Sequence, residues 1–425
     1  MLSRTPTQQD AHGSLRSWRE TIAAGYRRLF VQQWSPYLGA VLLVAVGAAL
    51  MLGGLFWGVF GGLKLWGDYL NQFLGLGAAL NIADDLPSPL LHRISLMNIT
   101  LLLGALAAAL LSGQFRINRP PPMEYLWGAL GGCLMGVGAT LAGGCTIGGF
   151  FTPMSFFSAA GWAMCGGLMV GAFIGLKLLL WTIEHTGGGA SPPAGVPSVK
   201  LRRFYPLFGS IILVGILLWA LSWHLSDSKQ LVSRTNIILA GFALGFILHR
   251  SRFCFARVFR EPFMTGDATL TKALIVAFAL GIPLFSFLLQ NNSVDPYLAI
   301  PASFWPGSLA GGALFGVGMV FAGGCGSGSL WRAGEGHLKL MLAVLFFAWG
   351  GSLASAALKH WGVLTPHLDL DFLDGMAEIT MLGYQAFLPD LLGSWSVVYV
   401  LSYGLLLAWY VLVRYNERSN RFTMM

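Results

Sequence analysis

The sequence predicts an all-α polytopic membrane protein with two inverted-topology halves, whose broken or half-length helices meet near the membrane midplane. Three observations predict this fold. Of the 425 residues, 55% are hydrophobic and only 10% are charged, and the mean hydropathy is +0.66, which excludes an ordinary soluble domain. Several stretches are uncharged for the roughly 20 residues that a helix needs to cross the hydrocarbon core. A glycine- and cysteine-rich motif also occurs twice.

The apolar stretches differ in length. Two of them, 125–176 and 297–331, are uncharged but interrupted by Gly, Pro, Ser and Thr, so each predicts several short or broken helices. The stretch 236–248 is shorter than a full crossing. Together the stretches predict about ten passes. Single crossings are expected at 37–63, 94–115, 204–226, 273–294, 340–358 and 391–413.

A polar segment divides the chain in two. Residues 184–203 combine Gly, Pro, Ser and charge between apolar blocks, which is typical of an exposed linker. The expected organisation is a cytoplasmic segment (1–35), a first membrane half (36–183), the linker (184–203), a second membrane half (204–415) and a cytoplasmic tail (416–425).

The formal net charge of +8 comes from basic residues beside the apolar stretches. The positive-inside rule explains this placement, so we expect no nucleic-acid partner, and both termini in the cytoplasm of an inner-membrane protein surrounded by lipid. Residues 1–35 show no cleavable signal pattern. The basic clusters are Arg16, Arg19, Arg27 and Arg28; Arg116 and Arg119; Lys200, Arg202 and Arg203; and Arg414, Arg418 and Arg421.

The five cysteines do not form a disulfide or metal pattern. Their number is odd, they lie in or beside apolar sequence, and neither Cys-x-x-Cys nor His spacing accompanies them. We therefore expect reduced thiols, no metal and no cofactor. The absence of a P-loop argues against internal ATP hydrolysis. The cysteines are Cys133, Cys145, Cys165, Cys254 and Cys325.

An internal repeat selects two of these thiols. Residues 131–138 (GGCLMGVG) align with 311–318 (GGALFGVG), and at the same offset 142–148 (AGGCTIG) align with 322–328 (AGGCGSG). Cys145 and Cys325 are therefore equivalent, whereas Cys133 aligns with Ala313 and Cys165 has no counterpart, which indicates packing roles for the latter two.

Charge also predicts the orientation of the two repeats. The basic residues around Arg250 and Arg260 indicate a cytoplasmic turn, whereas residues 290–306 contain no Lys or Arg and are expected outside. The second motif then enters the membrane from the opposite face, an arrangement in which substrates often bind near the midplane. An acidic loop with Asp369, Asp371, Asp374 and Glu378 is also expected outside.

The repeated Gly-Gly-Cys-x-x-Gly motif is suited to an anion passage. Backbone amides at a helix break need polar partners inside a membrane, and a half-helix that begins near Gly148 or Gly328 presents free N–H groups to an anion. Gly144 and Gly324 allow close approach of a solute. Thiols add weak donors, which favour release as well as capture.

A third thiol, Cys254, follows a cationic cluster that includes Arg250, which suggests anion attraction at a pore mouth. The alternative is that the cations are cytoplasmic anchors and the cysteine is a small buried hydrophobe. Further along the chain, Arg332 and Glu335 are spaced so that they could form an ion pair on adjacent helical turns, which we interpret as structural or gating. Asp and Glu are absent from both motif segments, so no proton carrier is evident there.

These residues resemble the YeeE/YedE family of membrane transporters. The resemblance covers most of the chain and rests on LAGGCTIGGFF, RSRFCFARVFRE followed by MTGD, and FAGGCGSGSLWRAGEGH. The two longer motifs look more like the YedE branch than the YeeE branch. The resemblance implies inverted halves and transport of a small sulfur or selenium anion, thiosulfate first, by S–H contacts at Cys145, Cys254 and Cys325. It also implies a cytosolic sulfurtransferase-like partner.

The same residues are also compatible with other functions. The cargo could be a selenium compound or another sulfur anion, and the route could be passive or partner-driven. The thiols could instead relay sulfur covalently as persulfide, although only a helix N-terminus is available to activate them. A purely structural membrane subunit is the third possibility.

Overall fold

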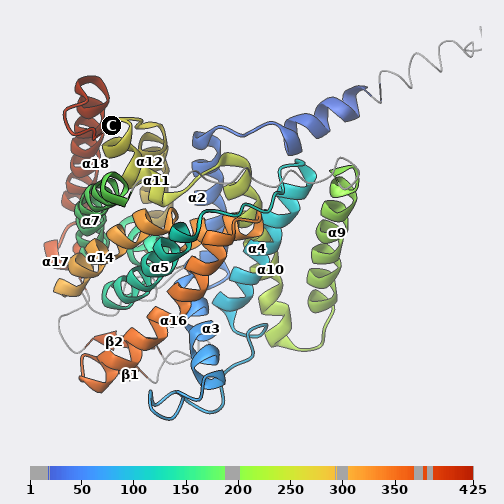
Figure 1. The fold of residues 1–425 in the computed structure, drawn as a ribbon, viewed down its shortest axis with the longest axis horizontal. Helices are drawn as coiled ribbons and strands as arrows, with labels where there is room; N and C mark the ends of the chain where they lie inside the picture. Colours follow the sequence, from blue (N-terminus) through green and yellow to red (C-terminus); the bar gives the residue numbers. More distant parts are fainter. Residues whose placement is uncertain are drawn as a thin grey trace, which may run out of the picture.

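The computed structural model describes residues 18, 20–186, 202–291, 293, 305–367, 377–380 and 386–424. Helices dominate this part of the chain (Figure 1). Nine of its helices are long and apolar enough to cross a membrane, or ten if residues 20–31 and 36–52, which meet at 79°, count as one bent span. The predicted all-α polytopic membrane fold is therefore confirmed.

The main helices are α2 (Pro36–Leu52), α3 (Phe60–Phe73), α4 (Arg93–Leu111), α5 (Pro122–Ala142), α7 (Ala159–Thr186), α9 (Tyr205–His224), α10 (Lys229–Ser251), α11 (Phe255–Met264), α12 (Thr269–Gln290), α14 (Pro306–Ala322), α15 (Gly326–Gly334), α16 (Leu338–His360) and α18 (Trp395–Ser419). The short elements are η1 (Arg27–Val31), η2 (Thr146–Phe151), α6 (Thr152–Ser155) and α17 (Leu388–Leu392). Strands β1 (Leu364–His367) and β2 (Ala377–Thr380) form an antiparallel pair in which Leu364 faces Thr380. Of the acidic loop expected outside, Asp369, Asp371 and Asp374 lie outside the described residues.

Helices α5 and α14, which carry the repeated glycines, cross in antiparallel contact. A methyl group on Gly131 would lie 2.5 Å from the Gly318 carbonyl oxygen, and one on Gly318 would lie 2.6 Å from that of Gly131. A methyl group on Gly138 or on Gly311 would likewise lie 2.5 Å from the carbonyl oxygen of the other residue. Because Gly318 is the repeat equivalent of Gly138, each helix uses the same two positions in reverse order. This reciprocal contact is what two inverted repeats require.

Other helices also pack against helices of the opposite sequence half. Helix α5 packs against α16 of the second half, and α14 packs against α7 of the first half. Helices α2 and α12 pack together, as do α4 and α10. Each half is thus completed by helices of the other half, so the two sequence halves do not form separate bundles.

Two predicted crossings have different bounds in the structure. The stretch 37–63 is not one crossing, because α2 ends at Leu52 and a non-helical segment that includes Gly54 (φ 72°) separates it from α3. The stretch 236–248 is not short, because α10 extends from Lys229 to Ser251. Its ends contain Arg234 and Arg250, whose buried guanidinium groups bond to the carbonyl oxygens of Gln230 and Gln32.

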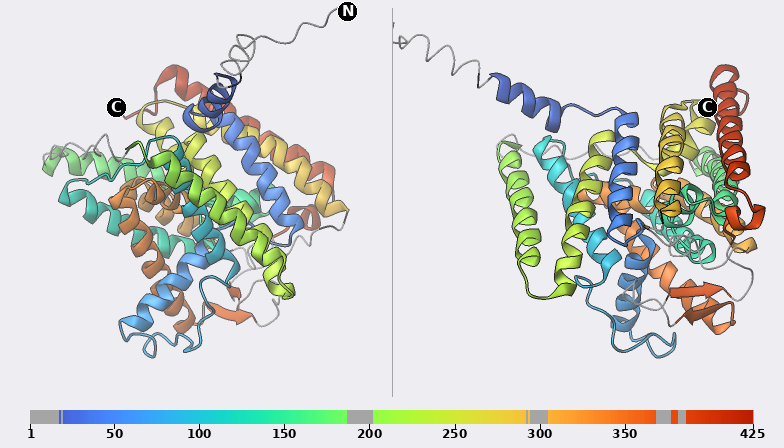
Figure 2. Two further views of the ribbon diagram at one scale, coloured as in Figure 1. Left: turned by 90° about the vertical axis from the view of Figure 1, so that its right-hand side faces the viewer. Right: turned by 180° about the vertical axis from the view of Figure 1, so that it is seen from behind.

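The stretch 125–176 is broken, as predicted, into α5, η2, α6 and α7, and the described part of 297–331 is divided between α14 and α15. Most of the expected linker lies outside the described residues, although α7 extends to Thr186. Helices α9 and α18 stand at opposite ends of the long axis (Figures 1 and 2). Their apolar windows are only 17% and 28% buried, so they offer most of their surface to lipid.

Basic residues gather at one end of the bundle, which we call the basic end. Here the Tyr26 hydroxyl bonds to the Leu111 carbonyl at 2.6 Å, and Arg202 bonds to the Gly113 carbonyl at 3.3 Å. The Met424 N–H bonds to the Phe263 carbonyl at 2.9 Å, which ties the C-terminal segment to α11. Residues 20–31, the end of α4, the start of α9, α11 and the end of α18 therefore lie at the same end (Figure 2).

We expect the glycine crossing to limit stability. Ala at Gly138 would place a methyl group against the Gly311 carbonyl, and such overpacking costs about 1–3 kcal/mol, more than the gain in helix propensity. The melting temperature of the purified protein in detergent should fall for Gly138→Ala and for Gly311→Ala. Gly215→Ala is the control, because a methyl group on Gly215 meets nothing within 4 Å. Unchanged melting of both crossing variants would contradict this packing.

Candidate functional site

Each repeated motif folds as a helix, a left-handed turn and a second helix. Gly143 (φ 74°) ends α5 and Gly323 (φ 82°) ends α14, conformations that glycine adopts without strain. The next cysteine is then the N-cap residue: Cys145 precedes η2 and Cys325 precedes α15. The second helices therefore begin at Thr146 and Gly326, two residues before Gly148 and Gly328.

The cysteine sulfurs act as acceptors at these helix starts. The Ile147 N–H donates to Cys145 Sγ at 3.4 Å, and the Gly328 N–H donates to Cys325 Sγ at 3.3 Å. Cys325 Sγ also lies 3.6 Å from the Ser327 hydroxyl. Because each sulfur accepts from the backbone, its S–H proton can still be donated to a solute.

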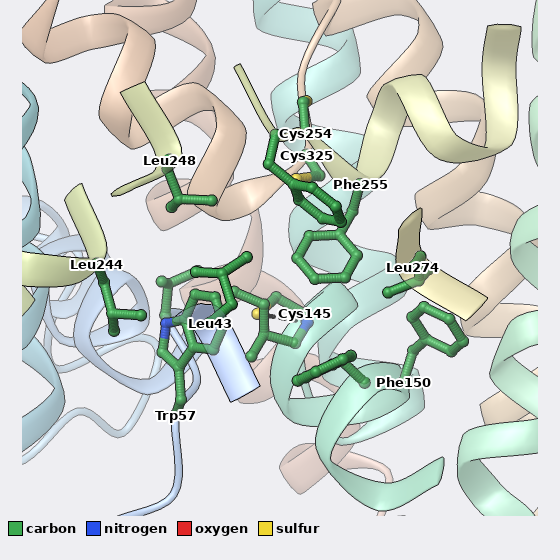
Figure 3. Packing of buried hydrophobic residues seen from close by; sticks show 14 of the residues in the cluster. Leu43, Trp57, Cys145, Phe150, Leu244, Leu248, Cys254, Phe255, Leu274 and Cys325 are labelled. Carbon is green, nitrogen blue, oxygen red and sulfur yellow. Dashed lines mark hydrogen bonds between the residues drawn. The ribbon is translucent and has the colours of Figure 1, made fainter. Parts of the chain in front are cut away.

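Three of the predicted cysteines converge, although they come from distant parts of the chain. A methyl group on Gly328 would lie 2.8 Å from Cys254 Sγ and 3.1 Å from Cys325 Sγ. One on Gly326 would lie 3.5 Å from Cys145 Cβ. Figure 3 shows Cys254 beside Cys325, with Cys145 further from this pair in the same buried region. The first turn of α15 therefore borders the sulfurs of Cys254 and Cys325 at Gly328 and the Cβ of Cys145 at Gly326, and a side chain at Gly328 would collide with Cys254 Sγ.

The third thiol is positioned by a break between α10 and α11. Arg252 ends α10 in the left-handed conformation (φ 54°), and Cys254 is then the N-cap residue of α11. In the first half, the break between α2 and α3 approaches the motif in a similar way, since a methyl group on Gly58 would lie 3.5 Å from Gly148 Cα. Both halves thus bring a second helix break to their own motif.

The predicted glycines have different neighbours. A methyl group on Gly144 would lie 2.6 Å from the Gly149 backbone nitrogen, so Gly144 keeps the turn closed on itself. One on Gly324 would lie 3.1 Å from the Ser329 hydroxyl, and one on Gly148 would make an ordinary 3.7 Å contact with Gly58. Gly328 alone of these four faces the thiols.

Aromatic side chains form a wall beside the thiols. The Phe150 ring lies 6.4 Å from that of Phe255 and 5.5 Å from that of Phe278, in edge-to-face pairs. All three are buried, and Figure 3 shows Phe150 and Phe255 near Cys145. This wall is packed against its own members, as expected of packing residues.

The remaining predicted residues lie elsewhere. Arg250 is buried, and its guanidinium donates to the Gln32 carbonyl, so it anchors the segment before α2. Cys165 is buried within α7, and Cys133 is half-buried on α5 where Gly350 of α16 packs against its backbone. The contacts described for Arg250 and Cys133, and the position of Cys165 within α7, do not involve Cys145, Cys254 or Cys325.

The expected Arg332–Glu335 ion pair is wrong. Glu335 Oε1 instead pairs with Arg252 Nη1 at 2.7 Å and with His249 Nε2 at 3.6 Å, because the turn after α15 directs it towards α10. Burial alone would raise the pKa of Glu335, but the neighbouring His249 ring and the Arg252 guanidinium, which donates to Glu335 Oε1, lower it to about 2. Arg332 Nη1 donates to the Gly323 carbonyl at 3.0 Å.

A buried acidic residue also escaped sequence reasoning. Asp68 of α3 pairs with Lys64 at 3.2 Å and accepts from the Ser352 hydroxyl at 2.5 Å, while Asn71 Nδ2 donates to the same hydroxyl at 2.8 Å. The sequence feature that could have indicated this ion pair is the position of Asp68 four residues after Lys64. The predicted crossing stopped at residue 63, so this pair appeared to lie outside the membrane.

Comparisons with known proteins agree with this architecture. A sequence model described as "Sulphur transport" matches residues 3–174 and 250–423. The chain is 29% identical to "Probable transporter YedE" of Escherichia coli over 80% of its own length and 85% of that protein. It is 34% identical to "Thiosulfate transporter TsuA" of Spirochaeta thermophila, over 29% of this chain and 37% of that protein. The E. coli protein of the same name is 32% identical over 26% of this chain and 31% of its own length.

The matched regions include all three motifs that converge in the structure, and the long match to YedE agrees with the predicted branch. With both halves matched, nine candidate spans among the described residues and transporters as relatives, this multi-pass membrane protein belongs to the sulphur transport family.

Proposed function

We propose that this protein transports a small sulfur anion, thiosulfate first, past the thiols of Cys145, Cys325 and Cys254. The observation that carries the proposal is the convergence of these thiols around the first turn of α15. A cluster of three unoxidised cysteines from separate segments is more than packing requires, and relatives named thiosulfate transporters add support.

The chemistry of the cluster suits passage of an anion. A bare anion is very costly to place in a low-dielectric interior, so donors must accompany it. Thiols donate weakly, and the first turns of η2 and α15 add backbone N–H groups. Weak donors lower the barrier without holding the anion too tightly. Gly144, Gly148, Gly324 and Gly328 complete the proposed substrate-binding set, with Arg250 as a more distant contributor of positive charge.

We further propose an inner-membrane location with both termini in the cytoplasm. The basic end supports this orientation, because the positive-inside rule assigns clustered Lys and Arg to the cytoplasmic side. The reciprocal crossing of α5 and α14 supports inverted halves. A cytosolic sulfurtransferase-like protein that receives the anion at this end is part of the same proposal.

Removing any of the three thiols should abolish uptake. We expect Cys145→Ala, Cys254→Ala and Cys325→Ala each to reduce labelled thiosulfate uptake about tenfold or more in cells that lack other importers, because each leaves one step without its donor. Cys165→Ala is the matched control, since Cys165 is also buried but lies outside the cluster. Normal uptake in all three variants at normal expression would refute the thiol route.

Serine substitution separates non-covalent transport from persulfide relay. A hydroxyl still donates a hydrogen bond but cannot form a persulfide. We expect Cys145→Ser to retain more uptake than Cys145→Ala, with no sulfane sulfur detectable on the purified wild-type protein after transport. Equal loss in both variants, together with cyanide-releasable sulfur on the wild-type protein, would favour the covalent relay.

The space at Gly328 should also be essential. Gly328→Ala would place a methyl group against the Cys254 and Cys325 sulfurs, which we expect to reduce thiosulfate uptake about tenfold while lowering the melting temperature no more than Gly138→Ala does, because side-chain sulfurs can shift more easily than backbone. Gly404→Ala on α18 is the control, because a methyl group there meets nothing within 4 Å. Full activity of Gly328→Ala would place the route elsewhere.

A further inference from the structure

One cation beside the thiol cluster has no carboxylate partner within the described residues. Arg332 is half-buried, and its guanidinium bonds to the Gly323 carbonyl. Glu335, the nearest acidic residue along the chain, is committed to Arg252 and His249. Cations removed from water are ordinarily paired with an anion. Within the described residues, Arg332 forms a hydrogen bond to the Gly323 carbonyl but no carboxylate ion pair.

The position of Arg332 on α15 places it one helical turn from the residue that borders two of the thiols. Residues four apart on a helix share one face, so Arg332 lies one turn beyond Gly328, the residue that faces Cys254 and Cys325. Its hydrogen bond to Gly323 brings the guanidinium back to the turn that precedes Cys325. Arg332 is also within electrostatic range of both Cys254 and Glu335, although it forms no ion pair with Glu335.

Three neighbouring cations are paired with carboxylates, whereas Arg260, which also lies near Arg332, has a buried Nε without a hydrogen-bond partner within the described residues. Arg257 Nε pairs with Glu261 at 2.5 Å, Lys339 pairs with Glu124, and Arg252 pairs with Glu335. In the first repeat, the alignment continued from Gly148 places Thr152 at the position of Arg332. The charge at the thiols is thus a property of the second repeat alone.

We propose that Arg332 supplies the fixed positive charge of the anion site and sets its preference for doubly charged oxyanions such as thiosulfate. A guanidinium has five N–H donors in a planar fork that matches two oxygens of a tetrahedral anion. One donor is used on Gly323, which holds the fork in place, while the thiols contact the rest of the anion. This inference rests on the proposed function, because it assigns a residue of the same site.

The first test is transport kinetics in proteoliposomes. Relative to wild type, we expect Arg332→Gln to raise the KM for thiosulfate about 10- to 100-fold, as for loss of a charge-assisted hydrogen bond. Arg332→Lys should be intermediate, because lysine keeps the charge but loses the fork. Arg257→Gln is the matched control from the same cluster, and its KM should change less than about threefold since Glu261 already neutralises it. An unchanged KM in Arg332→Gln overturns the inference.

Anion-dependent melting temperatures test the role of Arg332 separately from the proposal that the cargo is thiosulfate. If the wild-type protein does not transport thiosulfate, its melting temperature in detergent is measured with thiosulfate, sulfate and selenate. Stabilisation by one of these anions that is lost in Arg332→Gln but kept in Arg257→Gln supports the role of Arg332 while refuting thiosulfate transport. No stabilisation of the wild type by any of them, or equal stabilisation of Arg332→Gln, overturns the inference. The melting temperatures without anion show whether each variant is folded.

Discussion

Close backbone contact between α5 and α14 is the constraint on which the rest of the structure depends. At this crossing the two helices touch through glycines, so no side chain separates their backbones. Inside a membrane there is no hydrophobic force to join helices, and small residues that permit close packing take its place. Because both motifs follow directly from these helices, the crossing also determines how near Cys145 and Cys325 can come.

The helix breaks that follow the crossing would be costly if they were not satisfied locally. An irregular backbone at membrane depth must be buried in protein or line a polar cavity. Here a left-handed glycine closes one helix and a cysteine sulfur accepts a backbone N–H at the start of the next. The thiol is thus part of the fold as an acceptor and part of the proposed route as a donor. A purely packing cysteine would need neither arrangement.

The membrane class, the broken motifs and the equivalence of Cys145 and Cys325 could be predicted from the sequence, because hydropathy and a repeat are local signals, whereas the link to Cys254 came from the family resemblance. Sequence reasoning failed where tertiary contacts decide. Burial of Arg234 and Arg250 against carbonyl oxygens lets α10 extend beyond its apolar stretch. The break between α2 and α3 is supported by Asn98, which donates to the Val59 carbonyl at 2.9 Å from a distant helix. Glu335 pairs with Arg252 and not with Arg332 because it lies in the turn after α15, which faces α10. Residue spacing along the sequence does not reveal this contact.

The two ends of the thiol cluster differ in charge, which gives the proposed route a direction. Cys145 lies beside the uncharged break between α2 and α3, whereas Cys254 follows Arg252, whose guanidinium reaches Gln114 at the turn after α4 and so belongs to the basic end. An anion passing from Cys145 to Cys325 and Cys254 would move towards Arg332 and then towards that end. On the proposed route, the positive charge would attract the anion towards the basic end. The carboxylates of Glu261 and Glu335 offset part of this charge, because each pairs with an arginine beside the cluster.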